Sequence, residues 1–431
     1  MDKVMKGKSW FWLLLFVILA GSNMSVLLAK SEKVQIWDRG THYKVNINFS
    51  KKPCHWEVGV EYGKQLRKQM PKFEALVDSY LAEITGNDYG YRIMLGRAKD
   101  IEPQVSREYL DEISGLGKTI CSTMEAIRGD NKLSPDELLL YNLVPDVARG
   151  TQCSAVGVFG SRSAIRKTIM ARVLDFYTGS QNQLPKLQAV TYITYNTKND
   201  TQSICLIGFL GYFGVISGLN GQVFAAILDS TSGAAYSSQG KRSYPMDLRF
   251  ALENKDHLHE VAGYMSESVK NYSYNHLIAL ADSWGFHVLE NNISGTGSDI
   301  HRALRNDCSP LNDGITWGIR DAVACVNSFV LKGNHDNHTI NPNNMARWAK
   351  IKELLAAQDV FTRADLKKLI SYHYGPEPGS QLNGDLYNVN TQQIVIYEPD
   401  SLSLEVFFRP KNTKLPVEPL FETVSVFSCD N

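Results

Sequence analysis

The pattern of hydrophobic and polar positions changes about a third of the way along the chain. Before residue 153, apolar side chains recur at spacings of three and four along 55–84 and 106–127, which predicts amphipathic helices. The stretch 134–148 opens with Ser134 and Pro135 ahead of two acidic residues, a typical helix start. We therefore expect a helical leader before residue 153.

After residue 153 the pattern turns to short β-branched and aromatic runs separated by Gly, Asn and Ser, which predicts strands. The expected strands occupy 154–160, 167–176, 189–196, 203–220, 222–229, 277–290, 392–399 and 403–410. Helical patterns interrupt them at 245–269, 341–357 and 362–375. Strand clusters interleaved with helix pairs predict an α+β fold in which helices cover antiparallel sheets.

Charge and the N-terminus narrow the class of protein. The 431 residues carry 45 Lys and Arg against 45 Asp and Glu, so the net charge is zero and a nucleic-acid partner is not expected. Three lysines precede the apolar run 10–21, which predicts a secretory signal and is short for a membrane-spanning helix. We expect a signal peptide over 1–29, cut between 20 and 30, and a secreted, periplasmic or lysosomal protein.

One cysteine lies at the boundary between the two patterns. The chain has seven cysteines, an odd number, so at least one thiol is unpaired or pairs with another chain, and their irregular spacing does not fit a zinc site. Cys153 lies in "RGTQCSAVGVFG", where a polar loop runs into a strand. A cut between Gln152 and Cys153 would give Cys153 a free α-amine, and such a residue holds both a nucleophile and a base. The same thiol makes the cut by attacking the Gln152 carbonyl.

Charged partners for this thiol lie on the next predicted strand. In "MARVLDF", Arg172 is expected to hold the thiolate and Asp175 the α-ammonium group. Cys153 with this strand resembles the start of the cysteine N-terminal-nucleophile amidases. That group includes choloylglycine hydrolases, penicillin V acylases, acid ceramidases and isopenicillin N acyltransferase-like proteins. Arg172 and Asp175 match the family's Gly-Arg-Asn-Leu/Met-Asp strand, with Ala171 and Val173 in place of its Gly and Asn.

Two later motifs and the leader extend the resemblance. In "GNHDNHTINPNNMARW", Asn334 matches the family's oxyanion or substrate-contact Asn, followed by His335, and Arg347 matches its active-site Arg. In "SGLNGQVFAAILDS", Asn220 matches a turn that leads to an oxyanion-hole Asn, but Asp229 stands at that last position. Since a carboxylate does not donate as an amide does, Asn334 or a backbone N–H is expected to replace it. The leader segment "WEVGVEYGKQLR" resembles the opening of the acyltransferase-like proteins.

The resemblance implies a four-layer αββα sandwich of two antiparallel sheets, preceded by a helical pro-region. It divides the chain into a signal peptide (1–29), a pro-segment (30–152) and a catalytic body (153–431). The implied activity is hydrolysis of the linear amide of an N-acylated substrate, of the lipid amide, N-acyl amino acid, bile salt or penicillin type, without cofactor or metal. The two processed chains are expected to stay associated, and a lipid substrate would bring the protein to a membrane.

Other interpretations stay open at this stage. The same fold would also serve an acyltransferase that moves the acyl group to an amine. A Cys-His peptidase would pair Cys153 with His335, His338 or His373, and a non-catalytic secreted binding protein would hold Cys153 in a disulfide. His335, Asp336 and His338 also suggest a metal site, but they are cramped and no second ligand cluster accompanies them, so no metal is expected.

Aromatic residues supply candidates for an acyl pocket, since apolar walls suit a fatty or aromatic acyl chain. The better candidates lie in "LDFYTG", with Phe176 and Tyr177, and in "LGYFG", with Tyr212 and Phe213. Core packing is the alternative explanation for any one of them.

Overall fold

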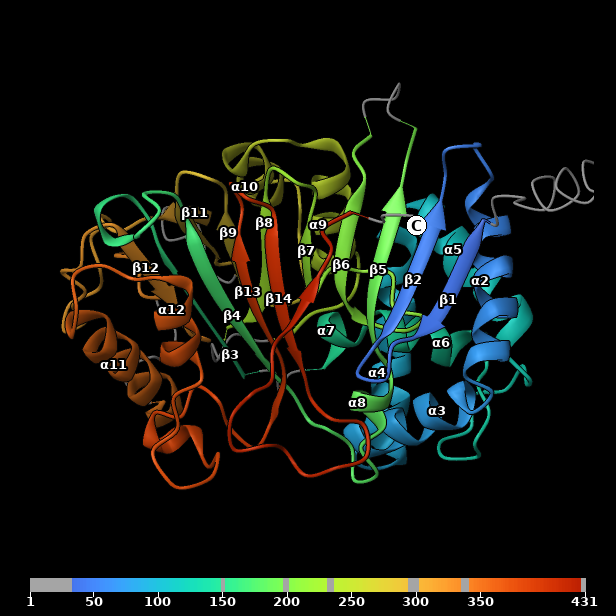
Figure 1. Cartoon of the computed structure of the whole chain (residues 1–431). Helices are drawn as coiled ribbons and strands as arrows, with labels where there is room; N and C mark the ends of the chain where they lie inside the picture. The colour runs from blue at the N-terminus through green and yellow to red at the C-terminus, as the bar shows by residue number, and fades with distance from the viewer. Residues whose placement is uncertain are drawn as a thin grey trace, which may run out of the picture.

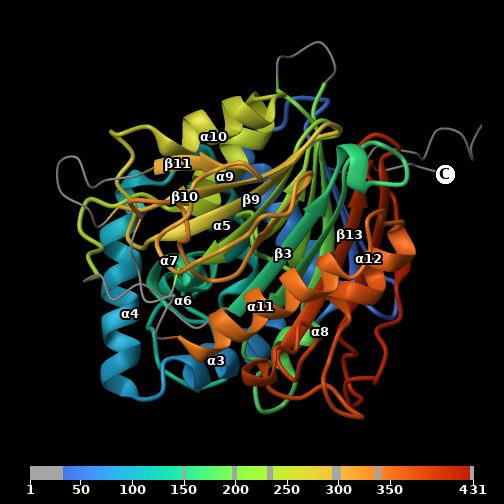
Figure 2. The ribbon, with the colours of Figure 1, turned by 90° about the vertical axis from the view of Figure 1, so that its left-hand side faces the viewer.

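Two β-sheets pack face to face, and helices cover both outer faces (Figures 1 and 2). The structure, a computed structural model, describes residues 33–148, 152–196, 201–230, 236–293, 302–334 and 341–427. The architecture is the αββα sandwich that the sequence predicts. The predicted signal peptide and the loop with His335, Asp336 and His338 lie outside the described residues.

The larger sheet has nine strands, and its first two come from the leader. Their spatial order is β1 (Val34–Asp38), β2 (Tyr43–Asn48), β5 (Gln188–Thr194), β6 (Ile204–Phe209), β7 (Ser217–Leu219), β8 (Phe224–Asp229), β9 (His276–Ala281), β10 (Phe286–Asn291) and β11 (Arg302–Arg305). β2 pairs with β5 in parallel, and the other neighbours run antiparallel. The leader is therefore not purely helical and the sheet not wholly antiparallel, which corrects two expectations from the sequence.

The smaller sheet carries the residues around Cys153. Its order is β12 (Ala322–Cys325), β3 (Gln152–Val158), β4 (Ile169–Asp175), β13 (Thr391–Glu398), β14 (Ser403–Phe408) and β15 (Glu422–Val424). All of its pairs are antiparallel. β3 is thus a central strand, hydrogen-bonded on both sides.

The described helices divide between the leader and the body, where the body means the chain from Cys153 onward. The leader contributes α2 (His55–Gln69), α3 (Phe73–Ile84), α4 (Asp88–Ile101), α5 (Arg107–Ile120), α6 (Pro135–Asn142) and α7 (Val144–Val147). The body contributes α8 (Gln183–Lys186), α9 (Tyr244–Asn254), α10 (Leu258–Ser266), α11 (Pro342–Ala356) and α12 (Arg363–Ile370). A capping box between Ser134 and Glu137 starts α6, at the helix start predicted there. The helix predicted over 245–269 is divided into α9 and α10.

Alternation along β3 assigns each side chain to one of two environments. Cys153 and Ala155 belong to the large core that joins the two sheets and the leader helices. Val156 and Val158 belong to a second core under α11 and α12, which lie across the outer face of this sheet (Figure 2). Because successive strand residues point to opposite faces, Cys153 faces the larger sheet and Ser154 faces the helices.

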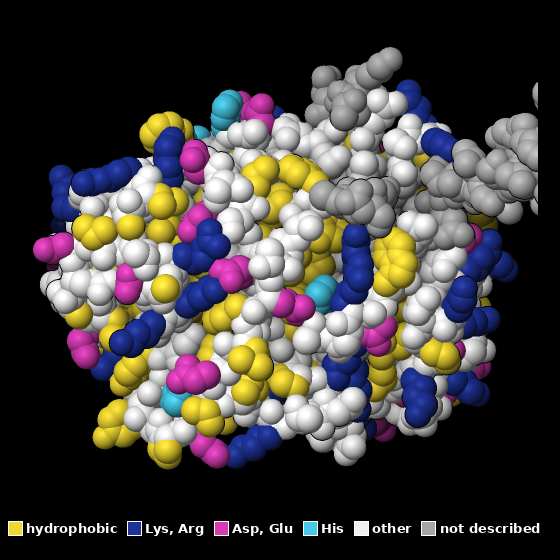
Figure 3. Space-filling model, viewed as in Figure 1, with side chains coloured by type: hydrophobic (Ala, Val, Ile, Leu, Met, Phe, Trp, Pro, Cys, Tyr) yellow, Lys and Arg dark blue, Asp and Glu magenta, His cyan; other side chains and the backbone are white. Residues whose placement is uncertain are grey.

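Surface charge agrees with the neutral composition. Figure 3 shows Lys and Arg side chains interspersed with Asp and Glu over the face that it presents. In the part of the chain that the structure describes, no helix has the length and apolar character needed to cross a membrane.

Candidate active site

Cys153 is the second residue of β3 and is almost fully buried. It lies opposite Leu174 in the β3–β4 register, and Arg172 lies opposite Ala155 on the same face. The Arg172 Nη2 atom is 3.5 Å from the Cys153 Sγ atom. The backbone N–H of Cys153 donates to Asn327 Oδ1 at 2.5 Å. Thiol and backbone nitrogen, the two groups required of an N-terminal nucleophile, therefore each have a polar partner.

The thiol is protonated at neutral pH in this uncut chain. Burial is the main cause that raises the pKa of Cys153, to about 11, with smaller increases from the charges of Asp175 and Asp229. The Arg172 charge and a hydrogen bond from the Asp175 backbone N–H act in the opposite direction. Attack by Sγ thus requires that the thiol proton is passed on during the reaction.

One nitrogen of the Arg172 guanidinium group makes both of its contacts at the site. Its Nη2 atom also donates to the Ile227 carbonyl at 3.1 Å, which holds the side chain against β8 of the facing sheet. Its Nε and Nη1 atoms have no hydrogen-bond partner among the described residues, although the side chain is fully buried. Burial lowers the pKa of Arg172, which the neighbouring Cys153 and Asp175 partly restore.

Asp175 lies on the other face of the sheet, opposite Gln152 in the register. Its carboxylate accepts hydrogen bonds from Gln381 Nε2 at 2.7 Å, Asn388 Nδ2 at 2.9 Å and Thr391 Oγ1 at 2.7 Å. Burial raises its pKa, against the effect of these hydrogen bonds. Three donors therefore fix the carboxylate beside the Gln152–Cys153 peptide bond.

Arg347 ties the start of β3 to the helix layer. It lies in α11, whose first turn is capped by the Asn341 side chain. Its Nη1 atom donates to the Cys153 carbonyl and, at 2.9 Å, to Ser154 Oγ. Its Nη2 atom donates to Asn327 Oδ1 at 3.2 Å. The sequence-predicted Arg347 therefore holds the Cys153 carbonyl directly and the Cys153 N–H through Asn327.

Asn327 is the site residue that sequence reasoning missed. It follows β12, and the β12–β3 register, extended by two residues, places it opposite Cys153. Its Oδ1 atom accepts from Cys153 and Arg347, and its Nδ2 atom donates to the Asp229 carbonyl at 2.8 Å. An Asn directly after a strand pattern in "VACVNS" is the signal in the sequence, but that pattern does not reveal which strand it pairs with.

Asn334, assigned to the oxyanion in the sequence analysis, lies in a neighbouring network. Its Nδ2 atom donates to Glu290 Oε2 at 3.1 Å, and its Oδ1 atom is 3.5 Å from Asn292 Nδ2. Arg305 completes the network by donating to Glu290 Oε1 at 3.0 Å. The amide of Asn334 thus lies against a buried carboxylate, and its oxyanion role stays a prediction.

Asn220 holds a turn at the far end of β8. Its Nδ2 atom donates to the carbonyls of Leu252 and Lys255, and its Oδ1 atom accepts from the backbone of Gln222 and Val223. These four bonds use the side chain completely, and β8 separates it from Asp229. Asn220 therefore lies in the turn that the sequence predicts, at the opposite end of β8 from Asp229.

Asp229 does reach the site, through its backbone and its charge. Its carbonyl accepts the amide of Asn327, and its charge contributes to the raised pKa of Cys153. Its carboxylate accepts from Tyr244 Oη at 2.9 Å. His335, the remaining candidate, lies outside the described residues.

Three alternatives from the sequence concern a Cys-His peptidase, a disulfide at Cys153 and a metal site. His373, a candidate peptidase base, donates from Nδ1 to the Gly375 carbonyl at 2.8 Å, and no hydrogen bond joins a described histidine to Cys153. Six cysteines are described and all are free thiols, so Cys153 is not in a disulfide. Across the ranges described above, no cluster of three or more His, Cys, Asp or Glu side chains is suited to a metal ion.

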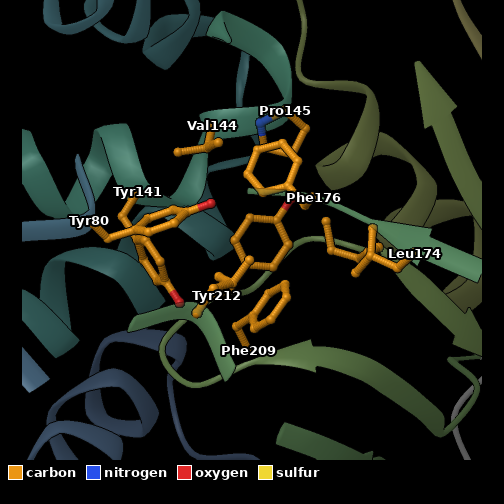
Figure 4. A pocket seen from close by; sticks show the side chains of 10 residues that line it. Tyr80, Tyr141, Val144, Pro145, Leu174, Phe176, Phe209 and Tyr212 are labelled. Carbon is orange, nitrogen blue, oxygen red and sulfur yellow. The ribbon is translucent and has the colours of Figure 1, made fainter. Parts of the chain in front are cut away.

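An apolar cavity lies between the leader and the body (Figure 4). It has about 50 Å³ of free volume, and both leader and body contribute to its walls: Tyr80, Tyr141, Val144, Pro145, Leu174, Phe176, Leu184, Phe209, Tyr212 and Ile216. Leu174 is the cross-strand partner of Cys153, which places the cavity on the thiol's face of the sheet. Phe176 and Tyr212 thus line a cavity, whereas Tyr177 is half exposed and Phe213 packs in the core against Tyr62.

Comparison with known proteins finds similarity in structure only. No protein-family model matches the chain, and no curated protein matches it. A Caenorhabditis elegans ortholog of N-acylethanolamine-hydrolyzing acid amidase matches with a TM-score of 0.42 and 15% identity, over 57% of this chain and 93% of that one. A mutant conjugated bile acid hydrolase from Clostridium perfringens matches at 0.35 and 12%, over 64% and 99%. Penicillin V acylase from Agrobacterium tumefaciens matches at 0.29 and 10%, over 64% and 78%.

Proposed function

We propose that this protein is a self-processed amidase in which Cys153 becomes an N-terminal nucleophile. The observation that carries the proposal is the pair of contacts at Cys153, with Arg172 at its thiol and Asn327 at its backbone nitrogen. The first contact supports attack by sulfur, and the second supports proton transfer at nitrogen.

Processing exchanges the amide bond between Gln152 and Cys153 for a thioester bond. Cys153 Sγ bonds to the carbonyl carbon of Gln152, the C–N bond to Cys153 breaks, and the thiol proton goes to the released nitrogen. Water then hydrolyses the thioester, which returns the thiol and leaves a carboxylate on Gln152. Asn327 accepts from the nitrogen of this peptide bond, and Arg347 donates to the Cys153 carbonyl of the next one, so the Cys153 side of the bond is held still while it reacts.

Turnover repeats the same steps on an external amide. The α-amine of Cys153, with an ordinary pKa of about 7.7–8.0, takes the thiol proton and delivers it to the leaving amine. We assign the oxyanion donor to Asn327, since its side chain contacts Cys153 directly, whereas Asp229 offers a carboxylate and Asn334 contacts Glu290; the Asn327 Nδ2 atom would exchange its bond to the Asp229 carbonyl for one to the oxyanion. Arg172 favours the thiolate, and Asp175 holds the ammonium form of the amine.

The substrate is a small N-acyl amide whose acyl part enters the apolar cavity. The aromatic and aliphatic walls around the cavity match an apolar acyl group in character. Because Tyr80, Tyr141, Val144 and Pro145 belong to the leader, the leader has to remain in place after the cut. The β2–β5 pairing and the buried Glu112–Arg249 ion pair support that association.

The experiment compares the purified wild type with Cys153→Ala by intact-mass spectrometry and an amide panel. We expect wild-type fragments that meet at Gln152/Cys153, and an uncut, inactive variant. Cys205→Ala is the matched control, since Cys205 is a buried thiol in β6 whose pKa is raised by burial alone. An intact active wild type, or activity in Cys153→Ala, would refute the mechanism.

A further inference from the structure

Two buried residues at the start of α9, Ser243 and Tyr244, hold the end of the leader, and we call this pair the α9 clamp. Ser243 Oγ donates to Asp146 Oδ2 at 2.6 Å, and the Tyr244 backbone N–H donates to Asp146 Oδ1 at 3.1 Å. The Tyr244 hydroxyl donates to the Pro145 carbonyl at 2.8 Å. Pro145 and Asp146 belong to α7, the last described leader element before the proposed cut. The clamp therefore fixes the chain just upstream of the bond to be broken.

The Tyr244 hydroxyl also contacts the body side of the site. Its oxygen lies 2.9 Å from Asp229 Oδ1, and since a tyrosine hydroxyl carries one hydrogen, Asp229 and Pro145 share that hydrogen. The Asp229 carbonyl accepts from Asn327 Nδ2 at 2.8 Å, and Asn327 Oδ1 accepts from the Cys153 N–H at 2.5 Å. Pro145, upstream of the cut, and Cys153, directly after it, are therefore both anchored to Asp229.

These contacts act at a different place from those that keep leader and body associated. The β2–β5 pairing and the Glu112–Arg249 ion pair already join the two parts elsewhere in the fold. Gln152 is the first residue of β3 and pairs with β4, whereas the β12–β3 pairing stops at Ala155. The acyl side of the scissile bond thus has a neighbouring strand on one side only. A fixed upstream end limits the positions open to the Gln152 carbonyl, and attack by sulfur requires a defined distance and angle.

We propose that the α9 clamp is a positioning device for self-cleavage, which holds the leader end so that the Gln152 carbonyl lies within reach of Cys153 Sγ. The inference rests on the proposed self-processing and names residues that serve this step alone. In turnover the scissile amide belongs to a separate substrate, which has no covalent link to Pro145 or Asp146. The clamp then has no reacting bond to position.

The test separates the rate of cleavage from the rate of turnover. Tyr244→Phe removes the hydroxyl but keeps both hydrogen bonds to the Asp146 carboxyl group, so α7 stays docked. Cell-free synthesis stopped at intervals, followed by intact-mass spectrometry, gives the half-time of the cut at Gln152/Cys153. We expect this half-time to be about tenfold longer in Tyr244→Phe than in the wild type. Once cut, the variant should hydrolyse the best amide of the panel with a kcat, per cut chain, within about twofold of the wild-type value.

Tyr272→Phe is the matched control. Tyr272 is buried, its ring packs edge-on against the Tyr244 ring, and its hydroxyl donates to Asp247 Oδ2 at 3.2 Å, within the body. This variant should be cut at the wild-type rate. Equal half-times in the wild type and Tyr244→Phe, or an equal fall in cleavage rate and kcat, would overturn the inference and leave the amidase proposal intact.

Ser243→Ala is a second variant, which decides on the clamp if Tyr244→Phe does not fold. It loses the 2.6 Å bond to Asp146 and should lengthen the half-time while kcat is kept, whereas loss of its α9 cap alone would lower both rates together. A wild type that is cut but hydrolyses no amide contradicts the amidase proposal alone, since the half-times still decide on the clamp. A wild type that stays uncut overturns both the clamp and self-processing.

Discussion

A buried ion pair joins the leader to the body, and breaking it should loosen the whole protein. Glu112 in α5 accepts two hydrogen bonds from Arg249 in α9, at 2.6 and 2.9 Å, and one from His55 at 2.6 Å. Arg249 also donates to Glu253 at 2.9 Å, and the side chains of both Glu112 and Arg249 have no exposed surface. Burial raises the pKa of Glu112, but the Arg249 charge and the hydrogen bonds outweigh it, so the net pKa is lowered.

The change Glu112→Gln keeps the shape of the side chain and removes its charge. Loss of one partner of a buried ion pair costs about 3–5 kcal/mol, because the other charge stays buried without full compensation. Glu253 still faces Arg249, so we expect the lower end of this range. With an m-value of about 3 kcal/mol per molar urea, the unfolding midpoint should fall by roughly 1–1.5 M. Urea titration of the uncut Cys153→Ala chain, followed by tryptophan fluorescence, measures it without processing.

The control is Glu108→Gln in the same helix. Glu108 lies 4.0 Å from the His55 ring, its side chain is 63% exposed, and removal of its charge should shift the midpoint little. Equal midpoints for the two variants would refute the claim that the Glu112–Arg249 pair holds leader and body together. A shift confined to one of two separate transitions would show that they unfold as independent units.

Three further predictions concern acid stability, the site and packing. Burial lowers the pKa of His55, but its partner Glu112 outweighs burial, so the net pKa is raised. The stabilisation by His55 is therefore fully present below pH ~6.5 and is lost as pH rises through the folded-state pKa. The difference in urea midpoint between the wild type and His55→Gln should shrink from about pH 5.5 to about pH 8.5. Asn327→Ala should slow processing and amide turnover about 10²–10³-fold, timed by mass spectrometry and kcat, and a loss below tenfold would contradict the oxyanion assignment. Gly157→Ala would place a Cβ 2.3 Å from Phe286 and should cost about 1–3 kcal/mol in thermal unfolding, whereas Gly263→Ala in α10 meets open space and should be neutral or stabilising.

Local pattern was sufficient for much of the fold. Helical spacing identifies α2, α3 and α5, because each buries one face, the Ser134–Pro135 start identifies α6, and β-branched runs identify the central strands. It missed β1 and β2, which are short; β2 pairs with β5, and that pairing joins segments about 145 residues apart. A segment of five or six residues shows only two or three alternations, so pairing with a neighbouring strand determines whether it forms a strand.

At the candidate site, the sequence determined what chemistry is available and the tertiary structure decided which residues share it. Cys153 at a loop-to-strand junction, with Arg172 and Asp175 on the following strand, is readable from spacing and type alone, and adjacent strands bring them together. Asn327 and Asn334 are both amides after the same strand, and only the β12–β3 register places one against Cys153 and leaves the other on Glu290. The partner of a long-range hydrogen bond depends on packing between distant segments, which no local pattern records.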